Sequence, residues 1–344
     1  MRPYSVYIYP NIPREQLGSR NPYIEQLKKA LQENGLMVDP STSRNAFADF
    51  LRHGFVSDMV ILNWIEDLPS RRLGIWQSLI LMTYILLLKI KGVKVIWIKH
   101  NKVSHTQKWF RARKMIQFLL SRYASHILLH AIDEETMQSE KVIFLPHPCN
   151  ITPDEIPFPD RATEPDIDFL IWGSILPYKG ILEFLQFAQN DEFLSKRTIH
   201  VAGKCAPDYF SKLGQYAGKN IHLVNKFVSE EEIRLLFKRT RFILFTYNTR
   251  SVLSSGVLMD SLVAAKRMIA PDCGAFRDMA LRQRFVSLFS DFSGIKDIYI
   301  EYCTDYNLDY DAVCAFVARN SWYLMGSKIK ELTGLSPEAP PLLQ

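Results

Sequence analysis

Short apolar runs alternate with longer amphipathic stretches through the first half of the chain. The runs are typical of buried strands, and the stretches between them have the three-to-four-residue spacing of helices. The expected strands are 4–9, 37–38, 59–62, 93–98, 127–129 and 142–145, and the expected helices are 23–34, 46–53, 73–88 and 107–121. Repeated strand–helix–strand units of this size predict a parallel, doubly wound sheet.

A proline-dense segment interrupts this alternation. Six of the 18 prolines lie between Pro146 and Pro165, and proline is excluded from helix interiors and central strands. The alternation then restarts, with strands at 167–172, 198–202, 221–224, 242–245 and 268–269 and helices at 181–189, 208–216, 230–238 and 256–265. We predict an α/β protein with two Rossmann-like, doubly wound domains facing a cleft. Its expected parts are a first domain at 1–148, a linker at 149–166, a second domain at 167–320, and a returning helix with a loose tail at 321–344.

The net charge of +6 is concentrated in one stretch of the chain. Residues 68–130 contain 12 lysines and arginines and no acidic residue, so the remainder is net acidic. Residues 73–88 within it carry no charge; as a helix they would extend about 24 Å, short of the roughly 30 Å of a bilayer core. This run predicts a buried or interfacial helix rather than a span. The surrounding cations predict an anionic membrane surface as a partner, and a solvated basic face around a buried helix is the alternative.

Cysteine usage and the N-terminal segment bear on the cellular compartment. The five cysteines contain no C-x-x-C pair, which predicts reduced thiols and neither a disulfide framework nor a metal site. The N-terminal segment alternates like a strand and lacks the apolar core of a signal peptide. We therefore expect a cytoplasmic protein, peripheral on the inner face of the membrane. No nucleic-acid-binding module is recognisable, and no nucleic-acid partner is expected.

Two glycine-containing loops follow expected strands in the second half. Ligands of open parallel sheets bind beyond the carboxyl ends of the strands, which makes such loops candidates for a site. Glycines and hydroxyls at helix starts let backbone N–H groups approach a phosphate, and a lysine can neutralise its charge. An ordinary turn and a simple helix cap are the alternatives. The first loop carries Gly173, Ser174, Tyr178, Lys179 and Gly180, and the second carries Tyr247, Ser254, Ser255 and Gly256, with Asp260 one turn into the next helix.

Two more loops carry side chains with possible chemistry. A histidine at the end of a strand can act as a general base or hold a hydroxyl, and a purely structural histidine is the alternative. This applies to His100 after the strand at 93–98, where cationic neighbours would lower the pKa of the imidazole. Loops after the strands at 198–202 and 221–224 could line a base pocket or be plain surface turns. The side chains concerned are Asn101 and His105, next to His100, and Lys204, Phe227 and Val228 in the possible pocket, with Phe227 stacking.

Taken together, the loops resemble those of the GT-B glycosyltransferases, and more narrowly the family 4 type of bacterial polysaccharide and lipid-linked glycan assembly. The similar segments are 100–105, 125–130, 142–148, 177–180 and 247–274. In proteins of this kind the first domain lies on the acceptor side and the second binds the nucleotide sugar. The resemblance covers nearly the whole chain.

The resemblance implies roles for the candidate residues. Lys179, Ser254 and Ser255 would hold the diphosphate of a UDP or GDP sugar, and Asp260 would hold its ribose. His100 would be the catalytic candidate, orienting the acceptor or donor sugar. Because positive groups would stabilise the leaving diphosphate, no metal and no other cofactor is expected.

Two positions depart from the family pattern. Ser174 stands where family 4 members usually carry an arginine near the start of the phosphate loop. Val252 stands at the first of two glutamate positions, and Asp260 at the second. The usual carboxylate contact to the donor sugar is therefore absent.

The expected function is transfer of a sugar, as a hexosyltransferase, from a nucleotide diphosphate donor to a glycan or lipid-linked acceptor in bacterial surface polysaccharide synthesis. A GT-B sugar-nucleotide epimerase is an alternative enzyme, since it needs the same donor site without an acceptor. A non-catalytic scaffold that binds polyanions or a membrane is the alternative from another class.

Overall fold

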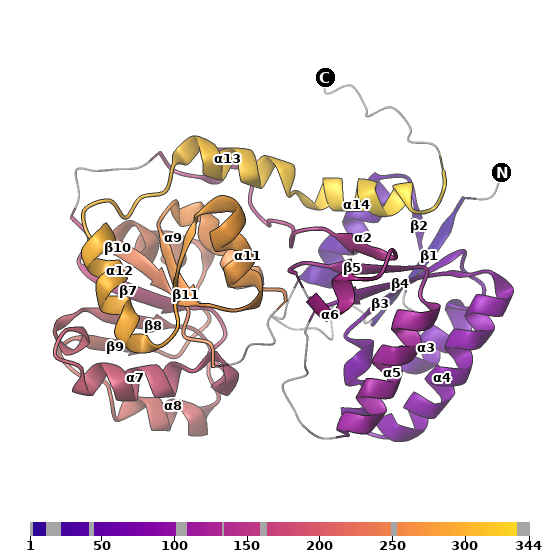
Figure 1. The fold of residues 1–344 in the computed structure, drawn as a ribbon, viewed down its shortest axis with the longest axis horizontal. Coiled ribbons are helices and arrows are strands. Elements are labelled where there is room, and N and C mark those ends of the chain that lie inside the picture. Colours follow the sequence, from indigo (N-terminus) through magenta and orange to yellow (C-terminus); the bar gives the residue numbers. More distant parts are fainter. Residues whose placement is uncertain are drawn as a thin grey trace. The chain divides into compact units, whose positions relative to one another are not determined.

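The computed structural model describes residues 3–11, 22–40, 45–100, 109–132, 134–158, 164–248 and 253–335. The chain divides into two compact units (Figure 1). Unit 1 comprises Met1–Pro148 and Asn320–Gln344, and unit 2 comprises Cys149–Arg319. The described part of the proline-dense segment after Pro148 belongs to unit 2, where it includes a short 3-10 turn, η2 (Pro153–Glu155).

Unit 1 is built on a six-stranded parallel sheet with the strand order β2-β1-β3-β4-β5-β6. All residues of β1 and β3 are buried, as expected for strands covered on both faces of a parallel sheet. The strands are β1 (Ser5–Tyr9), β2 (Met37–Val38), β3 (Met59–Asn63), β4 (Lys94–Lys99), β5 (His126–Leu129) and β6 (Val142–Phe144). The helices are α2 (Tyr23–Glu33), α3 (Ala46–His53), α4 (Gly74–Lys91), α5 (Phe110–Tyr123), α6 (Glu134–Met137) and α14 (Trp322–Glu331), with the 3-10 helix η1 (Ile65–Ser70) between β3 and α4.

Helices cover both faces of this sheet. Alternate strand residues point to opposite sides, and the two sets form separate apolar clusters. One cluster packs the sheet against α3, α4 and α5, and the other packs it against α2 and α14. A Cβ on Gly326 of α14 would lie 2.5 Å from the carbonyl oxygen of Ala30 in α2, so a glycine is required for this close helix contact.

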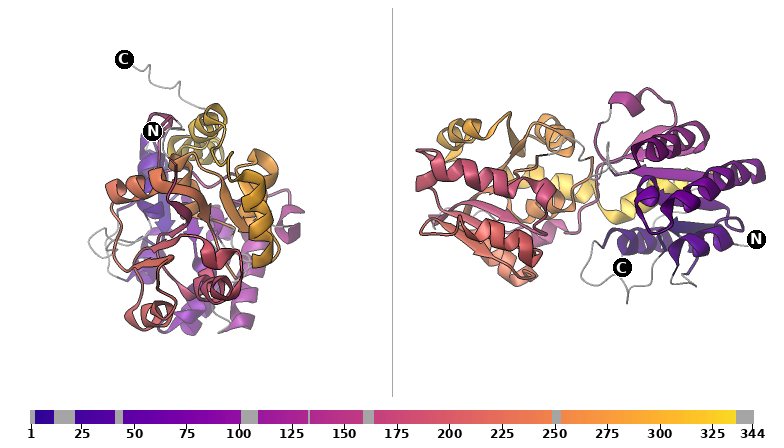
Figure 2. Two further views of the ribbon diagram at one scale, coloured as in Figure 1. Left: turned by 90° about the vertical axis from the view of Figure 1, so that its left-hand side faces the viewer. Right: turned by 90° about the horizontal axis from the view of Figure 1, so that it is seen from below.

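Unit 2 contains a second six-stranded parallel sheet, with the order β12-β11-β10-β7-β8-β9. Its apolar cluster packs one face against α7, α8 and α12, and further helices surround the sheet in Figure 2. The strands are β7 (Ile167–Trp172), β8 (Ile199–Ala202), β9 (Ile221–Val224), β10 (Thr240–Leu244), β11 (Met268–Pro271) and β12 (Val286–Phe289). The helices are α7 (Ile181–Asn190), α8 (Pro207–Gly214), α9 (Glu230–Arg239), α10 (Gly256–Asp260), α11 (Gly274–Gln283), α12 (Ile295–Tyr302) and α13 (Tyr310–Arg319), with 3-10 turns η3 (Pro177–Lys179), η4 (Leu194–Lys196), η5 (Ser261–Ala264) and η6 (Phe292–Gly294).

The predicted alternation of strands and helices is observed in both units, and several local features differ. Helices α6, α11 and α12 were not among the expected elements. The expected helix at 256–265 is a five-residue α-helix, α10, continued by the 3-10 turn η5. Strand β12 was missed, because its four residues VSLF are only half buried and follow an arginine-rich stretch. The expected helix at 107–121 is α5, which begins at Phe110; residues 107 and 108 lie outside the described residues.

Unit 1 buries a carboxyl group in its core. Glu66 of η1 is 2% exposed, and its Oε2 accepts a hydrogen bond of 3.3 Å from Trp97 Nε1. Its Oε1 has no hydrogen-bond partner among the described residues. Burial raises the pKa of Glu66 from 4.5 to about 7, with the charge of Asp67 adding to the increase. Since a buried carboxylate is costly without full pairing, the folded state favours the protonated form.

Glu66→Gln is expected to stabilise the protein at alkaline pH and to change little at acidic pH. In the wild type, Glu66 is protonated in both states below the unfolded pKa of about 4.5, and burial then costs little. As pH rises through about 7, the unfolded state gains from ionisation of this group, so the folded state loses stability relative to it. The amide cannot ionise, so the free energy of unfolding of the variant should exceed that of the wild type by about 3 kcal/mol at pH 8 and match it near pH 4.5. Urea unfolding at both pH values measures this. An equal effect of the substitution at the two pH values would contradict it.

Candidate functional site

The strand order of unit 2 defines a topological switch point. From the neighbouring strands β7 and β10 the chain proceeds to opposite sides of the sheet, to β8 and β9 on one side and to β11 and β12 on the other. The order is that of the dinucleotide-binding Rossmann fold. In such sheets, ligands bind where the loops leaving the two central strands separate, at the carboxyl edge. The loops after β7 and β10 are those that the sequence analysis selected for phosphate binding.

These two loops are held together by backbone contacts. Thr246 Oγ1 donates a hydrogen bond of 2.7 Å to the carbonyl oxygen of Lys179, and Asn248 N donates one of 3.3 Å to that of Tyr178. Gly180 has a φ of +68°, and a Cβ there would lie 2.2 Å from the carbonyl oxygen of Thr246. Both the positive φ and the close approach require glycine. These contacts therefore fix the backbone at Lys179.

The side chain of Lys179 is buried at the carboxyl edge of the unit 2 sheet. It is 6% exposed, and its Nζ lies 5.7 Å from the ring centre of Tyr247. Among the described residues, no carboxylate forms an ion pair with this ammonium group, and no acceptor forms a hydrogen bond with it. A Cβ on Gly173, whose φ is +90°, would lie 3.7 Å from Nζ and 3.1 Å from Val257 Cγ2, so a glycine lets the β7 loop pass close to the charge. Burial lowers the pKa of Lys179 to about 8. A buried cation with no ion-pair partner among the described residues is suited to binding an anionic ligand.

The hydroxyl of Ser255 has a structural role at this site. Its Oγ caps α10 by accepting a hydrogen bond of 3.2 Å from Leu258 N, and it is also hydrogen-bonded to the Tyr247 side chain. Trp172 at the end of β7 donates a hydrogen bond of 2.8 Å from Nε1 to Ser261 Oγ, which places α10 and η5 beside the β7 loop. Gly256 begins α10, and Ser254 just before it is half-buried.

Asp260 occupies the last position of α10 and is also hydrogen-bonded within the protein. Asn150 Nδ2 donates a hydrogen bond of 2.8 Å to Asp260 Oδ1. Burial raises the pKa of Asp260 to about 6, and the hydrogen bond from Asn150 opposes that increase. The side chain is thus held in place one turn beyond Ser255, and its role as a ribose ligand stays a prediction.

The loops after β8 and β9 extend the same edge. A Cβ on Gly203 would lie 1.8 Å from the carbonyl oxygen of Gly173, so the β7 and β8 loops touch through backbone atoms. Ile175 N donates a hydrogen bond of 2.9 Å to the carbonyl oxygen of Lys204, whose side chain is exposed. Phe227, after β9, is 67% exposed, and Val228 is half-buried. An exposed aromatic ring at this edge is available to stack on a base.

Ser174 and Tyr178 complete the predicted donor residues. Ser174, where the resemblance leads one to expect arginine, is exposed. The Tyr178 ring lies 5.8 Å from that of Tyr247, in an edge-on arrangement. The Tyr178 and Tyr247 rings therefore pack together between the β7 and β10 loops. Val252 lies outside the described residues.

Unit 1 gathers three histidines at the carboxyl ends of its strands. His100 follows β4, His130 follows β5, and His147 lies just beyond β6. All three are buried, and they surround the ring of Tyr23 in α2 at centroid distances of 4.7, 5.7 and 5.4 Å. Trp322 of α14 packs on the same ring. Sequence analysis selected only His100 as a functional candidate from this cluster. The strand-end positions of His130 and His147 were the signal that could have found them.

The hydrogen bonds of His100 indicate its tautomer. Asn63 Nδ2 donates to the carbonyl oxygen of Tyr9, so Asn63 Oδ1 is the atom 3.0 Å from His100 Nε2. An amide oxygen only accepts, which places the proton on Nε2 and leaves Nδ1 as an acceptor. Burial lowers the pKa of His100 well below 6.5, and His130 and His147 add to the decrease. The decrease was expected from cationic neighbours; the structure assigns it mainly to desolvation. Asn101 and His105 lie outside the described residues.

No group of three or more His, Cys, Asp or Glu side chains suited to a metal ion occurs in the described part of the chain. The D-x-D sequence at the start of β7 is engaged in structural contacts. Arg239 Nε donates to Asp166 Oδ1 at 2.9 Å, Thr198 N donates to Asp168 Oδ2 at 2.9 Å, and Tyr299 Oη donates to Asp168 Oδ1 at 2.6 Å. These carboxylates stabilise the amino-terminal side of the sheet.

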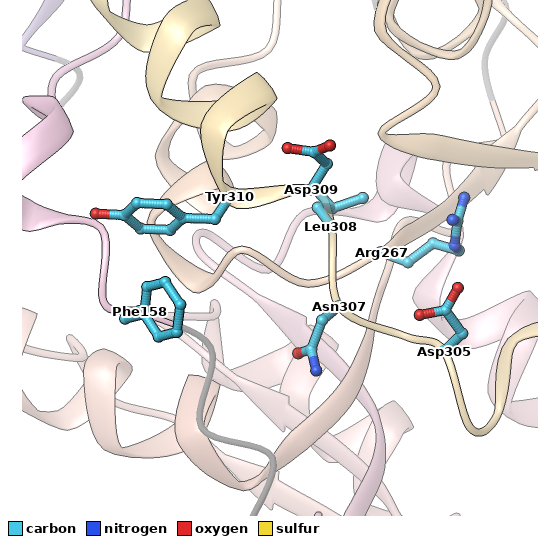
Figure 3. A pocket seen from close by; sticks show the side chains of 7 residues that line it. All are labelled: Phe158, Arg267, Asp305, Asn307, Leu308, Asp309 and Tyr310. Carbon is cyan, nitrogen blue, oxygen red and sulfur yellow. The ribbon is translucent and has the colours of Figure 1, made fainter.

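A surface cavity of 720 Å³ lies elsewhere in unit 2 (Figure 3). Arg267 directly precedes β11, so the cavity opens at the amino ends of the strands, away from Lys179. Arg267 lies 3.7 Å from the ring centre of Tyr302, and Phe158 packs against Tyr310. The lining residues are Phe158, Arg267, Asp305, Asn307, Leu308, Asp309 and Tyr310.

Comparison with known proteins identifies the fold. No protein-family model matches the chain, and no curated protein matches it in sequence. Solved structures match over nearly the whole length. HepE from Anabaena in complex with UDP has a TM-score of 0.65 at 12% identity, covering 96% of this chain and 100% of that one. Sucrose-phosphate synthase from Thermosynechococcus elongatus has a TM-score of 0.67 at 12% identity, with coverages of 96% and 98%. A glycosyltransferase from Rickettsia africae has a TM-score of 0.59 at 14% identity, with coverages of 97% and 98%. The chain therefore has the GT-B fold, with two Rossmann-like domains.

Proposed function

We propose that the protein is a glycosyltransferase that uses a nucleotide diphosphate sugar as its donor. The observation that carries the proposal is the buried ammonium of Lys179, which lies at the switch point of unit 2 and has no ion-pair partner among the described residues. A diphosphate would supply the missing negative charge. The structural likeness to HepE, which has been solved with UDP and with UDP-glucose, supports a UDP sugar as the donor.

The neighbouring side chains suit the remaining parts of such a donor. Ser254 and the backbone around Gly173 and Gly180 would contact the diphosphate together with Lys179. Asp260, held by Asn150, would accept a hydrogen bond from a ribose hydroxyl. The base would lie on the exposed ring of Phe227.

Transfer requires that negative charge on the departing diphosphate be stabilised. As the bond from the sugar to the diphosphate breaks, charge accumulates on the phosphate oxygens, and a preorganised cation nearby lowers the barrier. Lys179 is such a cation, already desolvated and fixed by the contacts of its loop. We propose that this charge makes the reaction independent of a divalent metal.

The acceptor side is proposed for unit 1. His100, with Nδ1 free to accept a hydrogen bond, would orient a sugar hydroxyl. The acceptor we propose is a glycan or a lipid-linked glycan of bacterial surface polysaccharide synthesis, and the transferred group a hexose. We propose that the enzyme acts in the cytoplasm, at the inner face of the membrane.

A thermal-shift screen with UDP, GDP, CDP and ADP tests the donor assignment and identifies the base together. We expect UDP to raise the melting temperature and, with UDP-glucose as donor, release of UDP that depends on an added acceptor. Formation of an isomerised nucleotide sugar without acceptor would instead identify an epimerase. The absence of a shift with every nucleotide, alongside a shift with polyanions, would overturn the transferase proposal.

Donor affinity is expected to decrease as pH rises above 8. The free protein has a Lys179 pKa of about 8, and a phosphate binds the ammonium rather than the neutral amine. The dissociation constant for UDP should therefore increase by about tenfold per pH unit beyond that value. Titration calorimetry from pH 7 to pH 10 measures it. Lys179→Arg keeps the positive charge at all these pH values and should remove the pH dependence of the dissociation constant. A wild-type dissociation constant that stays the same up to pH 10 would contradict phosphate binding by Lys179.

A further inference from the structure

Helices α4 and α5 present an exposed surface that is both apolar and basic. They lie side by side on one face of the unit 1 sheet (Figure 1), and both contribute to the same apolar cluster beneath them. We call this surface the apolar–basic face. Its exposed apolar side chains are Leu73, Trp76, Leu79, Ile80, Leu86, Leu87, Ile90, Phe110, Met115 and Phe118. Its exposed cations are Arg72, Lys89, Lys91, Arg111, Lys114 and Arg122.

The sequence of α4 is apolar around its whole circumference. Leu81, Ile85 and Leu88 are fully buried against the sheet. The opposite side is equally apolar, with Trp76 at 69% and Ile90 at 83% exposed. A helix of this kind is normally surrounded by protein or lipid on all sides. The described residues cover only its inner side, and the apolar side chains of its outer side are exposed.

The helix is anchored in unit 1 rather than free to cross a bilayer. It is the one described helix long and apolar enough for a span, and 33% of it is buried within the protein. Its 18 residues extend about 27 Å, less than a bilayer core of roughly 30 Å. Removing it from the sheet would also expose Leu81, Ile85 and Leu88 together with the strands beneath them. The geometry therefore favours contact along the length of the helix.

The two helices present their exposed sides in the same direction. Each packs its buried stripe on the same sheet face, through Leu81 and Ile85 in α4 and through Ile116 and Leu120 in α5. Each also connects neighbouring parallel strands, so the two helices run in the same direction, with their N-terminal ends at the carboxyl edge of the sheet. Trp76, Trp109 and Phe110 thus lie at the end of unit 1 that carries His100.

The charge of this face identifies its partner. Residues 68–130 contain no acidic residue, and Arg72, Lys89 and Arg111 form no ion pair with any described residue. Lys114 Nζ lies 5.7 Å from the Phe110 ring centre, so its aliphatic stem covers apolar surface while its charge stays at the rim. A second copy of the chain would oppose like charges, which disfavours self-association. An anionic bilayer matches both properties, since its headgroups attract the cations and its acyl region accepts the apolar side chains.

We propose that the apolar–basic face of α4 and α5 is a membrane-docking surface that binds anionic phospholipid bilayers without spanning them. Trp76, Ile80, Leu87 and Ile90 enter the headgroup–acyl boundary, and the surrounding cations contact lipid phosphates. The proposal concerns unit 1 and does not depend on sugar transfer. It also accounts for the row of large apolar side chains that α4 leaves exposed.

Co-sedimentation with vesicles tests the proposal, using phosphatidylglycerol mixed with phosphatidylcholine and phosphatidylcholine alone. The wild type should bind the anionic vesicles and be largely released by high salt. A charge variant, Arg72→Gln with Lys89→Gln, Arg111→Gln and Lys114→Gln, should lose roughly 100-fold or more in partitioning. An apolar variant, Trp76→Gln with Ile80→Gln, Leu87→Gln and Ile90→Gln, should lose binding even at low salt. All these side chains are exposed, so circular dichroism and melting temperature should stay unchanged.

Unit 2 provides matched controls. Lys212, Lys219, Lys238 and Lys296 are exposed, and replacing all four by glutamine removes the same charge as the charge variant. Leu281→Gln with Ile300→Gln removes exposed apolar side chains from the same unit. Both controls should bind vesicles like the wild type. The proposal would be overturned if the matched charge control lost as much vesicle binding as the charge variant. It would also be overturned if the apolar variant bound vesicles like the wild type. The proposal would also be overturned if the wild type formed a dimer that did not bind vesicles and the apolar variant were a monomer.

Discussion

Lys179→Met is expected to abolish nucleotide diphosphate binding and sugar transfer while leaving the protein as stable as the wild type or more so. The ammonium is buried with no ion-pair partner among the described residues, so the folded protein bears a desolvation cost that only a ligand offsets. Methionine has similar length and no charge, which removes the cost and the ligand contact together. Loss of a cation that stabilises developing charge typically reduces turnover by on the order of 10²–10³-fold.

Two measurements on the same variant separate binding from folding. The melting temperature without ligand should be unchanged or higher, and the shift caused by UDP should disappear. Lys212→Met, at an exposed position of α8 in the same unit, is the control and should keep both the shift and the activity. A Lys179→Met protein that binds UDP like the wild type would show that the phosphate lies elsewhere. A variant that melts well below the wild type would show that Lys179 has a structural role.

Gly203→Ala is expected to destabilise unit 2 and to weaken nucleotide binding. A Cβ at this position would lie 1.8 Å from the carbonyl oxygen and 2.8 Å from the carbonyl carbon of Gly173. These are backbone atoms of the phosphate loop, so the overlap can be relieved only by separating the loops after β7 and β8. That separation would break hydrogen bonds such as the one from Ile175 N to the Lys204 carbonyl. We expect a loss of about 4 kcal/mol, at the upper end for a single substitution.

Urea unfolding followed by circular dichroism measures this loss, and UDP titration of the folded fraction measures its effect on the site. Gly214→Ala is the matched control, because nothing lies within 4 Å of a Cβ there and the residue ends α8. It should be neutral or slightly stabilising, since alanine favours helix more than glycine does. Similar unfolding midpoints for the two variants would mean that the close loop contact is absent in solution.

The loops of the candidate donor site could be selected from the sequence because their signals are local. The strands leading into Gly173 and Tyr247 are short apolar runs, and a glycine on each side of Lys179 identifies a loop that must turn sharply. The alternation of strands and helices predicted a doubly wound sheet, and the strand order that defines the switch point came from the structure. What the sequence did not indicate is that Lys179 is buried and lacks a counter-ion among the described residues. That depends on Tyr247 and Gly173, which are brought to it by strands β10 and β7.

The histidine cluster of unit 1 shows the opposite case. His100, His130 and His147 belong to loops after different strands, and Tyr23 and Trp322 come from near the two ends of the chain. No spacing rule links residues so far apart. His100 alone was identified, because it follows a recognisable strand, and the cause of its low pKa was wrongly assigned to nearby cations. Desolvation is a property of the packed core, which no short segment reports.

The sequence by itself determined that this protein has two parallel sheets, where most of their strands lie, and which loops leave their carboxyl ends. Those features depend on the periodicity of apolar residues and on proline and glycine, which act within a few residues. It also determined that a basic, acid-free segment surrounds an apolar helix. Only the tertiary structure decided which side of α4 is buried, which of its cations form no ion pair among the described residues, and that no described carboxylate pairs with Lys179. These outcomes depend on which distant side chains exclude water from each group, and burial of this kind is set by the packing of whole sheets and helices.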